Sequence, residues 1–363
     1  MKQNQILMIH GSEYKQMTMR LLEAADLAGQ IGDPAKRIAL KPNLVLASTP
    51  ELGAVTHPEI VAGVLEYLQT HGFRNLRVME GSWVGAKTMP AARESGLLSV
   101  CEEYAVPFVD LQADSSISVD GKGMSIKICN QAQETDFLIN LPVLKGHCQT
   151  MLTCALKNLK GLLPNSEKRR FHTLGLHKPI AHLNAAIRQD FIVVDNICGD
   201  LDFEEGGTPV SMDRIFCCLD PVLCDAFACE TLGLQTQDVP YIALAESLGI
   251  GCADVERAEL IPLNGGTVAP EQRRSGRIRE LAAYTEPIDA CSACYGMLIH
   301  ALDKLERQGT LRGHRQKICI GQGYRGQTGQ IGVGSCTSGC ACHLNGCPPT
   351  AKDILAFLEK NWR

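Results

Sequence analysis

The first 265 residues alternate short apolar runs with longer stretches of helical periodicity, and this alternation constrains the fold more than any other feature. Strands that alternate with helices are typical of a mostly parallel sheet with helices on both faces. We therefore predict a doubly wound α/β core domain over residues 1–265. The predicted strands are 5–10, 37–41, 75–80, 107–111, 136–141, 191–195, 214–220 and 260–263, with a hairpin at 115–129. The predicted helices are 16–31, 57–72, 89–105, 149–162, 179–189, 221–232 and 239–249.

The composition changes after this domain. Residues 267–280 are polar and charged and lack periodicity, so we predict a linker at 266–288. Residues 291–347 then hold seven of the 17 cysteines of the chain. We predict that residues 289–363 form a small cysteine-rich α/β module.

Charge and hydropathy exclude several classes of protein. A net charge of −5 argues against a dedicated nucleic-acid binder, which would usually be basic. The chain has no apolar run long enough to span a membrane, and its first residues do not resemble a signal peptide. We therefore expect a cytoplasmic protein. In that reducing compartment, clustered cysteines indicate metal or redox chemistry rather than disulfides.

The C-terminal cysteines predict a metal site. Cys291 and Cys294 open one predicted helix, and Cys347 precedes another, where the partial positive charge of a helix N-terminus favours thiolates. Cys336 ends a short apolar strand and is our choice for the fourth ligand, with Cys340 or Cys342 as its alternatives. The irregular spacing, and a proline after Cys347, favour a [4Fe–4S] cluster. Zinc, which usually takes two regular Cys-x₂-Cys pairs, remains the alternative.

Polar residues follow several predicted strands, at the edge where open parallel sheets bind their ligands. We therefore predict a binding site there. The residues at these strand ends are Lys41, Asn43, Glu80, Lys145, His147 and Asp195.

A strongly basic window lies within this acidic chain. Between Leu141 and Lys178 there are seven Lys and Arg residues and one acidic residue, Glu167, which gives this window a net charge of +6. We therefore predict a pocket for a small phosphate, carboxylate or sulfonate. Its further candidate residues are Lys157, Asn158 and Lys160. We expect His147, His172 and Lys145 to handle protons.

Several of these motifs together resemble the family catalogued as domain of unknown function 362. They are Lys41-Pro-Asn, Thr-His-Pro-Glu at 56–59, Glu80-Gly-Ser, Lys145-Gly-His, the run from Leu156 to Gly161, and Val194-Asp-Asn. The resemblance covers about residues 36–265 and implies an α/β fold. Members often carry an iron–sulfur segment, which the Gly-Cys-Pro-Pro sequence at 346–349 resembles. The N-terminal half is also distantly similar to the lactate racemase fold, but a clear match to its histidine pair is missing, so nickel is not carried over.

These features predict an iron–sulfur oxidoreductase that acts on a small anionic substrate and exchanges electrons with a redox partner protein. Two other functions remain open. The chain could be an electron-transfer or scaffold protein that serves a partner enzyme. It could also be a non-redox lyase or isomerase whose cluster acts as a Lewis acid.

Overall fold

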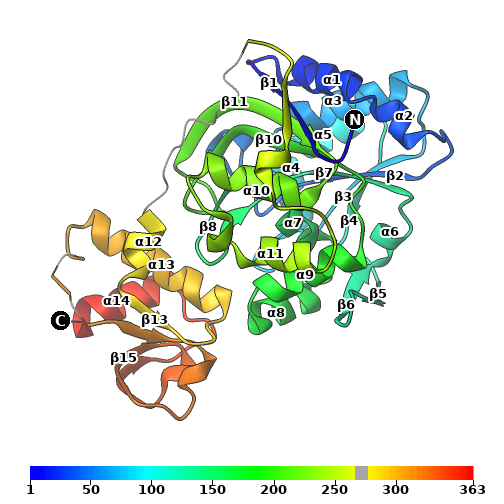
Figure 1. Ribbon diagram of the computed structural model, residues 1–363. Helices are drawn as coiled ribbons and strands as arrows, with labels where there is room; N and C mark the ends of the chain where they lie inside the picture. Colours follow the sequence, from blue (N-terminus) through cyan, green and yellow to red (C-terminus); the bar gives the residue numbers. More distant parts are fainter. Residues whose placement is uncertain (266–276, 312, 315, 363) are drawn as a thin grey trace. The chain divides into compact units, whose positions relative to one another are not determined.

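The computed structural model describes residues 1–265, 277–311, 313–314 and 316–362. It divides into two compact units, which are described separately (Figure 1). Among the described residues, the first unit comprises 1–147, 151–169 and 177–265, and the second comprises 148–150, 170–176 and 277–362. Residues 266–276, the first part of the predicted linker, lie outside the described residues.

The first unit is built on an eight-stranded sheet with the strand order β12-β1-β11-β10-β7-β2-β3-β4. All neighbouring strands are parallel except that β11 runs antiparallel to both β1 and β10. The mostly parallel sheet of the prediction is thus confirmed. Its strands are β1 (Gln5–His10), β2 (Ile38–Pro42), β3 (Leu76–Glu80), β4 (Phe108–Asp110), β7 (Phe137–Leu141), β10 (Phe191–Asp200), β11 (Pro209–Cys218) and β12 (Glu259–Pro262).

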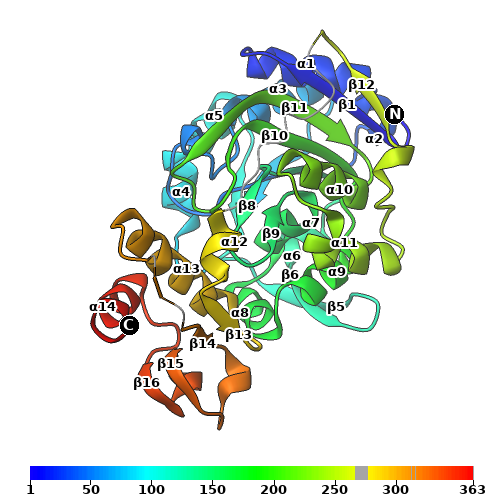
Figure 2. The ribbon, with the colours of Figure 1, turned by 60° about the vertical axis from the view of Figure 1, so that its left-hand side comes forward.

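Helices cover both faces of this sheet (Figure 2). On one face, alternate strand residues such as Leu7, Leu40 and Val78 share a buried core with the apolar sides of α1–α5. The helices α7, α9, α10 and α11 pack against one another on the other face. The bounds are α1 (Tyr14–Ala24), α2 (Leu27–Ile31), α3 (Pro58–Thr70), α4 (Thr88–Glu94), α5 (Leu97–Glu103), α6 (Asn130–Gln133), α7 (Ala155–Asn158), α8 (Asn165–Leu174), α9 (His177–Ala186), α10 (Pro221–Thr231) and α11 (Pro240–Ser247).

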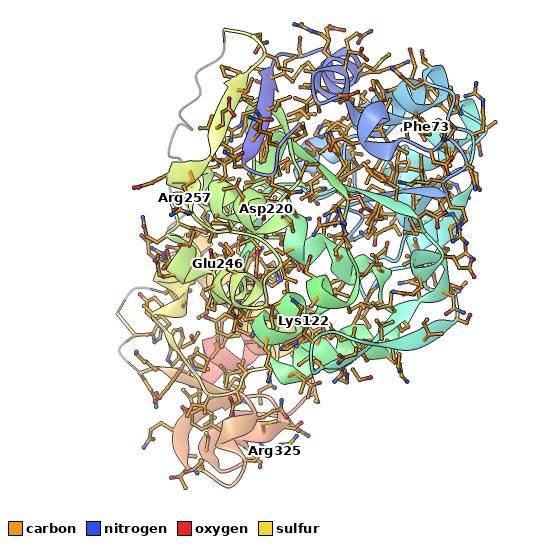
Figure 3. The ribbon with its side chains drawn as sticks, turned by 45° about the vertical axis from the view of Figure 1, so that its right-hand side comes forward. Phe73, Lys122, Asp220, Glu246, Arg257 and Arg325 are labelled. Atoms are coloured by element: carbon orange, nitrogen blue, oxygen red, sulfur yellow. The ribbon has the colours of Figure 1, made fainter. Side chains whose placement is uncertain are left out.

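The start of α10 is fixed by Asp220 (Figure 3). One oxygen of Asp220 accepts hydrogen bonds from the N–H groups of Val222 and Leu223, at 2.8 and 3.0 Å. The other oxygen accepts one from the N–H of Cys252, at 2.8 Å. Because the first N–H groups of a helix have no partner within it, this carboxylate both caps α10 and ties the loop before β12 to it.

Two predicted helices are each divided by a residue in the left-handed backbone region. The helix predicted over 16–31 is α1 followed by α2, with Asp26 at φ 51° between them. The helix predicted over 89–105 is α4 followed by α5, with Gly96 at φ 80° between them. The apolar periodicity continues across each break, so the pattern alone does not reveal it.

The helix predicted over 149–162 is wrong in its first part. Strands β8 (Lys145–His147) and β9 (Met151–Thr153) form an antiparallel pair, and only α7 and the short 3₁₀ helix η2 (Leu159–Leu162) are helical. A Cβ atom at Gly146 would lie 2.2 Å from the carbonyl oxygen of Leu201, so the close approach of these backbones requires glycine. The predicted hairpin at 115–129 is confirmed as β5 (Ser116–Asp120) and β6 (Ser125–Cys129).

Strands β10 and β11 are longer than predicted: β10 ends later, at Asp200, and β11 begins earlier, at Pro209. β10 and β11 form a long antiparallel ribbon that continues to the pair Asp200 and Pro209, with an irregularity between Asn196 and Cys198. This extension carries Cys198 and Asp200 past the end of the parallel part of the sheet.

The second unit contains a four-stranded parallel sheet in the order β13-β14-β15-β16. Its strands are β13 (Thr285–Pro287), β14 (Ile318–Ile320), β15 (Gly329–Val333) and β16 (Cys340–Leu344), and its helices are α12 (Arg277–Ala282), α13 (Ser292–Arg307) and α14 (Ala351–Asn361). Residues 277–288 of the predicted linker therefore form α12 and β13 of this unit. Thr350 caps α14 by accepting the N–H of Asp353 at 3.1 Å.

Nowhere in the described part of the chain is a helix both long and apolar enough to cross a membrane.

Candidate functional site

Lys41 and Glu80 form a buried ion pair at the carboxyl ends of β2 and β3. These strands are parallel neighbours, so their last side chains meet at the same edge of the sheet. Lys41 Nζ also donates to the carbonyl oxygen of Pro42 at 2.8 Å, and Glu80 Oε1 accepts the N–H of Gly81 at 2.7 Å. Burial lowers the pKa of Lys41 and raises that of Glu80, while each charge opposes this shift in the other.

The turn at Gly161 closes over this ion pair. A Cβ atom at Gly161 would lie 1.9 Å from Glu80 Oε1 and 2.6 Å from Lys41 Nζ. Only glycine lets the backbone of η2 approach the pair this closely.

Three asparagines connect the ion pair to a second group of charges. Asn158 Nδ2 donates to Asn140 Oδ1, and Asn43 Nδ2 donates to Asn158 Oδ1, each at 2.7 Å. Asn43 Oδ1 in turn accepts a hydrogen bond from Lys145 Nζ at 2.9 Å. These contacts fix the orientation of each amide, and Asn158 Oδ1 also accepts from Lys41 Nζ of β2 at 3.5 Å, so the chain joins β2, β7, β8 and α7.

The second group of charges contains Lys145, His147, Lys157 and Glu204. The Glu204 carboxylate pairs with Lys157, and it lies 3.2 Å from His147 Nε2. Lys145 Nζ is held by carbonyl oxygens of Ala54 and of Glu204, the latter at 2.9 Å. Burial lowers the pKa of Lys145 to about 7 and that of His147 to about 4. Glu204 lies outside the basic window of the sequence. Its carboxylate pairs with Lys157, and its carbonyl oxygen accepts from Lys145.

Two further lysines lie near these groups. Lys168 donates to the carbonyl oxygens of Gly81 and Ser82 at 2.7 and 2.9 Å, and burial lowers its pKa to about 8. Burial, and next the charge of Lys157, lower the pKa of Lys160 to about 7. We call Lys41, Lys145, Lys157, Lys160 and Lys168 the lysine cluster. The structure thus brings together all predicted substrate-binding residues except Asp195, and it adds Asn140, Lys168 and Glu204.

Asp195 instead holds His57. One oxygen of Asp195 lies 2.8 Å from both the backbone N and the Nδ1 atom of His57. Both residues are buried. The sequence at 56–59 is also typical of the start of a helix, so the sequence alone did not reveal that His57 contacts Asp195. His172 belongs to the second unit, and its role in proton transfer stays a prediction.

The four predicted cysteine ligands lie near one another in the second unit. Cys291 occupies the residue before α13, and the loops that carry Cys336 and Cys347 are joined by hydrogen bonds between Ser335 and Gly346. Burial, and next the charges of the other three thiols, raise the pKa of Cys294 to about 12. Burial also raises the pKa of Cys291, and Cys336 and Cys347 add to this shift.

The alternative ligands are arranged differently. Cys340 lies beside Cys319, since a Cβ atom at Gly329 would lie within 2.9 Å of both sulfurs. These two thiols form a small core with Tyr324. The nearby Cys336 raises the pKa of Arg325 (Figure 3).

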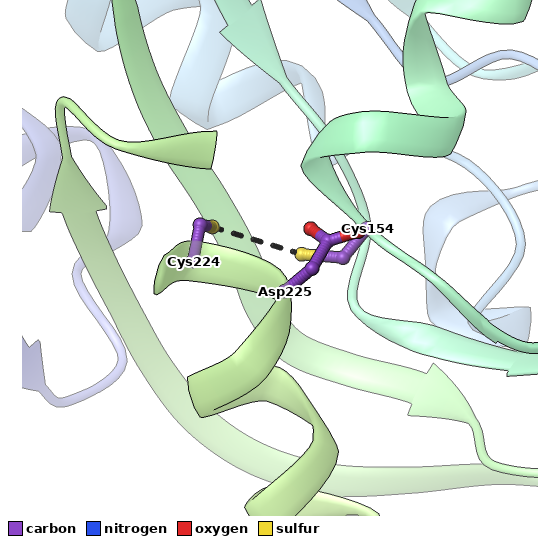
Figure 4. Close-up of side chains that lie close together, drawn as sticks. All are labelled: Cys154, Cys224 and Asp225. Atoms are coloured by element: carbon purple, nitrogen blue, oxygen red, sulfur yellow. Dashed lines mark hydrogen bonds between the residues drawn. The ribbon is translucent and has the colours of Figure 1, made fainter. Parts of the chain in front are cut away.

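A separate buried group consists of Cys154, Cys224 and Asp225 (Figure 4). The two sulfurs are 4.0 Å apart. Asp225 Oδ1 accepts the N–H of Ala155 at 2.7 Å and so caps α7, and burial raises the pKa of the Cys154 thiol to about 11. Protonated thiols, and a carboxylate whose oxygen already accepts a backbone N–H, are typical of a packed core. The sequence predicts such a core position for both cysteines.

Comparisons with known proteins cover mainly the first unit. The family described as "Domain of unknown function (DUF362)" matches residues 38–230, more than half of the chain. The thylakoid-associated protein sll1697 of Synechocystis sp. is 27% identical over 241 residues, which are 63% of this chain and 73% of that protein. The lactate racemase apoprotein from Thermoanaerobacterium thermosaccharolyticum superposes with a TM-score of 0.41 and 14% identity, over 62% of this chain. Because that match spans only 56% of the racemase, and its score is low, it carries no argument about activity.

Proposed function

The chain belongs to the DUF362 family, and on that premise we propose that it is an iron–sulfur oxidoreductase that binds a small anionic substrate at the lysine cluster. The anion would be bound in the first unit, and the cysteines of the second unit would hold a [4Fe–4S] cluster.

The gathering of the five amines of the lysine cluster is the observation that carries the anion site. Two carboxylates, Glu80 and Glu204, form the ion pairs described above with members of the lysine cluster. Burial is the main cause that lowers the pKa values of Lys168 and Lys160. The positive charge of Lys41 lowers the pKa of Lys168 further, and that of Lys157 lowers the pKa of Lys160 further. Like charges in a medium of low polarity repel strongly, so an anion among them would be bound tightly. Phosphate, carboxylate and sulfonate groups share the required charge.

Proton transfer would use Lys145 and His147. A lysine whose pKa is about 7 is present in both protonation states near neutral pH, which suits a general acid or base. His147, with a pKa of about 4, would be neutral and would donate from Nε2 to Glu204. Lys41 would add the positive charge of its ammonium group, which Glu80 partly offsets.

The cysteine set supports a cluster better than a single zinc ion. Zinc holds sulfurs at about 2.3 Å, which places them about 3.8 Å apart in a tetrahedron. Among the described residues, no three sulfurs of Cys291, Cys294, Cys336 and Cys347 lie within 4.8 Å of one another. A cubane of iron and sulfide is larger, and it would supply single electrons received from a redox partner protein. We place the protein in the cytoplasm, where such thiolates stay reduced.

Anaerobic iron and sulfide analysis with an electron paramagnetic resonance spectrum tests the cluster. We expect about four iron and four sulfide per chain, and loss of the spectrum in Cys294→Ser and Cys347→Ser. The matched control is Cys342→Ser, which should keep both. Stoichiometric zinc without sulfide, or a spectrum unaffected by Cys294→Ser, would refute the cluster.

Isothermal titration with phosphate, a carboxylate and a sulfonate tests the anion site. We expect Lys145→Met and Lys160→Met each to weaken binding at least about tenfold, because each removes a charge-assisted contact. Lys178→Ala is the matched control, since Lys178 is an exposed residue of the same basic window. No binding of any anion class, or equal loss in Lys178→Ala, would refute the site and favour the electron-transfer or scaffold function.

A non-redox lyase or isomerase is the second candidate, and the pKa of Lys145 favours it because proton transfer alone needs no electron. The two activities differ in their products. A substrate that is converted without consumption of a reductant would identify the non-redox function.

A further inference from the structure

Asp195 and Cys198 are brought to one side of β10 by a break in its pairing. Side chains three residues apart on a regular strand point to opposite faces. The register of β10 against β11 shifts between Asn196 and Cys198, and such an irregularity re-aims the side chains that follow it. As a result, both Asp195 and Cys198 contact the same imidazole, that of His57.

The imidazole bridges the carboxylate and the thiol through its two nitrogens. Nδ1 of His57 lies 2.8 Å from Asp195 Oδ2, and Nε2 lies 3.9 Å from Cys198 Sγ. Asp195 is itself fixed, because Oδ1 accepts the N–H of Ile197 at 3.2 Å and Oδ2 accepts that of His57 at 2.8 Å. The carboxylate therefore keeps Nδ1 protonated and aims Nε2 at the sulfur. This is the order of groups in a nucleophile, base and carboxylate triad.

We propose that Cys198 is a nucleophilic thiolate paired with the His57 imidazolium and oriented by Asp195, and that it attacks an activated acyl carbon, as in an ester or thioester. The proposal is independent of the iron–sulfur function. No second thiol among the described residues contacts Cys198, so thiol–disulfide exchange would have no resolving cysteine.

The step balances without an oxidant or a reductant. Cys198 Sγ forms a bond to the acyl carbon, the bond from that carbon to the leaving alkoxide or thiolate breaks, and the imidazolium gives its Nε2 proton to the leaving group. Water then attacks the acyl-enzyme, its proton returns to Nε2, and the thiolate is released.

Asp195 favours the charged form of His57, and the Cys198 thiol donates to the carbonyl oxygen of Pro50 at 3.4 Å. Burial lowers the pKa of His57, but the Asp195 carboxylate outweighs this and raises it to about 11. A neighbouring imidazolium stabilises a thiolate. The other titratable groups that face the pair are Tyr14 of α1, whose ring lies 5.6 Å from that of His57, and Glu51 of η1 (Pro50–Leu52). The Tyr14 hydroxyl donates a hydrogen bond to the carboxylate of Asp213 in β11.

Alkylation by iodoacetamide, followed residue by residue with mass spectrometry on the full chain between pH 5 and 9, tests the pair. At pH 6 a thiol with an ordinary pKa near 8.5 is less than about 1% ionised. We expect the alkylation rate at pH 6, relative to that at pH 9, to be at least about tenfold higher for Cys198 than for Cys252; the ratio removes the difference in exposure between the buried Cys198 and the exposed Cys252. The same pH profile for the two thiols would overturn the proposal.

Acyl transfer is tested with p-nitrophenyl acetate. We expect a burst of p-nitrophenolate and one acetyl group on Cys198, both lost in Cys198→Ser and kept in Cys252→Ser. His57→Gln and Asp195→Asn should each slow the burst by at least about tenfold. An acetyl group elsewhere, or a burst that persists in Cys198→Ser, would refute the nucleophile. The wild-type pH profile decides the matter if His57→Gln does not fold. Loss of the burst with an intact iron–sulfur spectrum would show that the two functions are separate.

Discussion

Lys41 and Glu80 pair at the ends of two neighbouring parallel strands with almost no exposure to solvent: their side chains are 0% and 3% exposed. A buried ion pair is held in place by its surroundings rather than by its own attraction, because both ions lose their hydration. Here the surroundings are the carbonyl of Pro42, the N–H of Gly81 and the turn at Gly161.

Breaking this pair should destabilise the first unit strongly. Lys41→Met leaves the Glu80 carboxylate buried without its partner, and we expect a loss of about 3–5 kcal/mol in the free energy of unfolding by urea. The double variant Lys41→Met with Glu80→Gln should recover part of this loss. Arg37→Ala breaks an exposed ion pair with Asp136 and is the control, for which we expect a smaller effect. A double variant less stable than Lys41→Met would contradict this account.

Gly161→Ala should be destabilising without any change of charge. The new methyl group would collide with the ends of Glu80 and Lys41, which are buried and held by hydrogen bonds, and overpacking of this kind costs about 1–3 kcal/mol. Gly265→Ala is the matched control, because a Cβ atom there would meet nothing within 4 Å. Thermal unfolding of the two variants makes the comparison. An unchanged midpoint for Gly161→Ala would show that the turn does not close over the pair.

Stability should rise with pH because of Lys145. Its pKa is about 7 in the folded protein and near 10.4 in an unfolded chain, so the unfolded state binds more protons between these values. The free energy of unfolding therefore increases with pH from about 7 to about 10, and Lys145→Met should flatten that rise. Urea unfolding at several pH values measures it. A slope equal in the variant and the wild type would contradict the lowered pKa.

Anion affinity should change with pH in the opposite sense. A bound anion stabilises the protonated amines of Lys145 and Lys160, so binding takes up protons above pH 7 and weakens as the pH rises. Titration in buffers of different ionisation enthalpy should show proton uptake at pH 8 and much less at pH 6. Proton release on binding would exclude these lysines as ligands.

Asp225 offers a test in which charge and capping are separated. Asp225→Ala removes the acceptor for the N–H groups of Ala155 and Leu156, and we expect a loss of about 1–3 kcal/mol. Asp225→Asn keeps an acceptor and should lose much less. Burial raises the pKa of Asp225 to about 7, so the wild type should lose stability as the pH rises from about 4 to 7, and Asp225→Asn should not. Thermal unfolding at pH 5 and 7 distinguishes these outcomes.

The sequence was sufficient for the elements whose pattern is local. The strands of the parallel sheet are continuous apolar runs, and the rule that ligands bind at strand carboxyl ends placed Lys41, Glu80 and Lys145 at one edge. The same reasoning missed the outer halves of β10 and β11, because residues 196–213 are not an apolar run and pair only with each other. It also began a helix at 149, across β9, since the pairing of β9 with β8 and the Gly146 backbone contact with Leu201 have no periodic signature.

Which side chains become partners was decided by the tertiary structure alone. Lys157 meets Glu204 across 47 residues of sequence, and His57 meets Asp195 across 138. Composition showed only that the window from Leu141 to Lys178 is basic. Whether those charges lie in water, pair with a carboxylate or stay buried without one depends on where distant strands are placed, and that placement sets the pKa of each lysine. The sequence thus determined the sheet and the polar residues at its edge, and packing determined the chemistry available there, because burial and long-range contacts control ionisation.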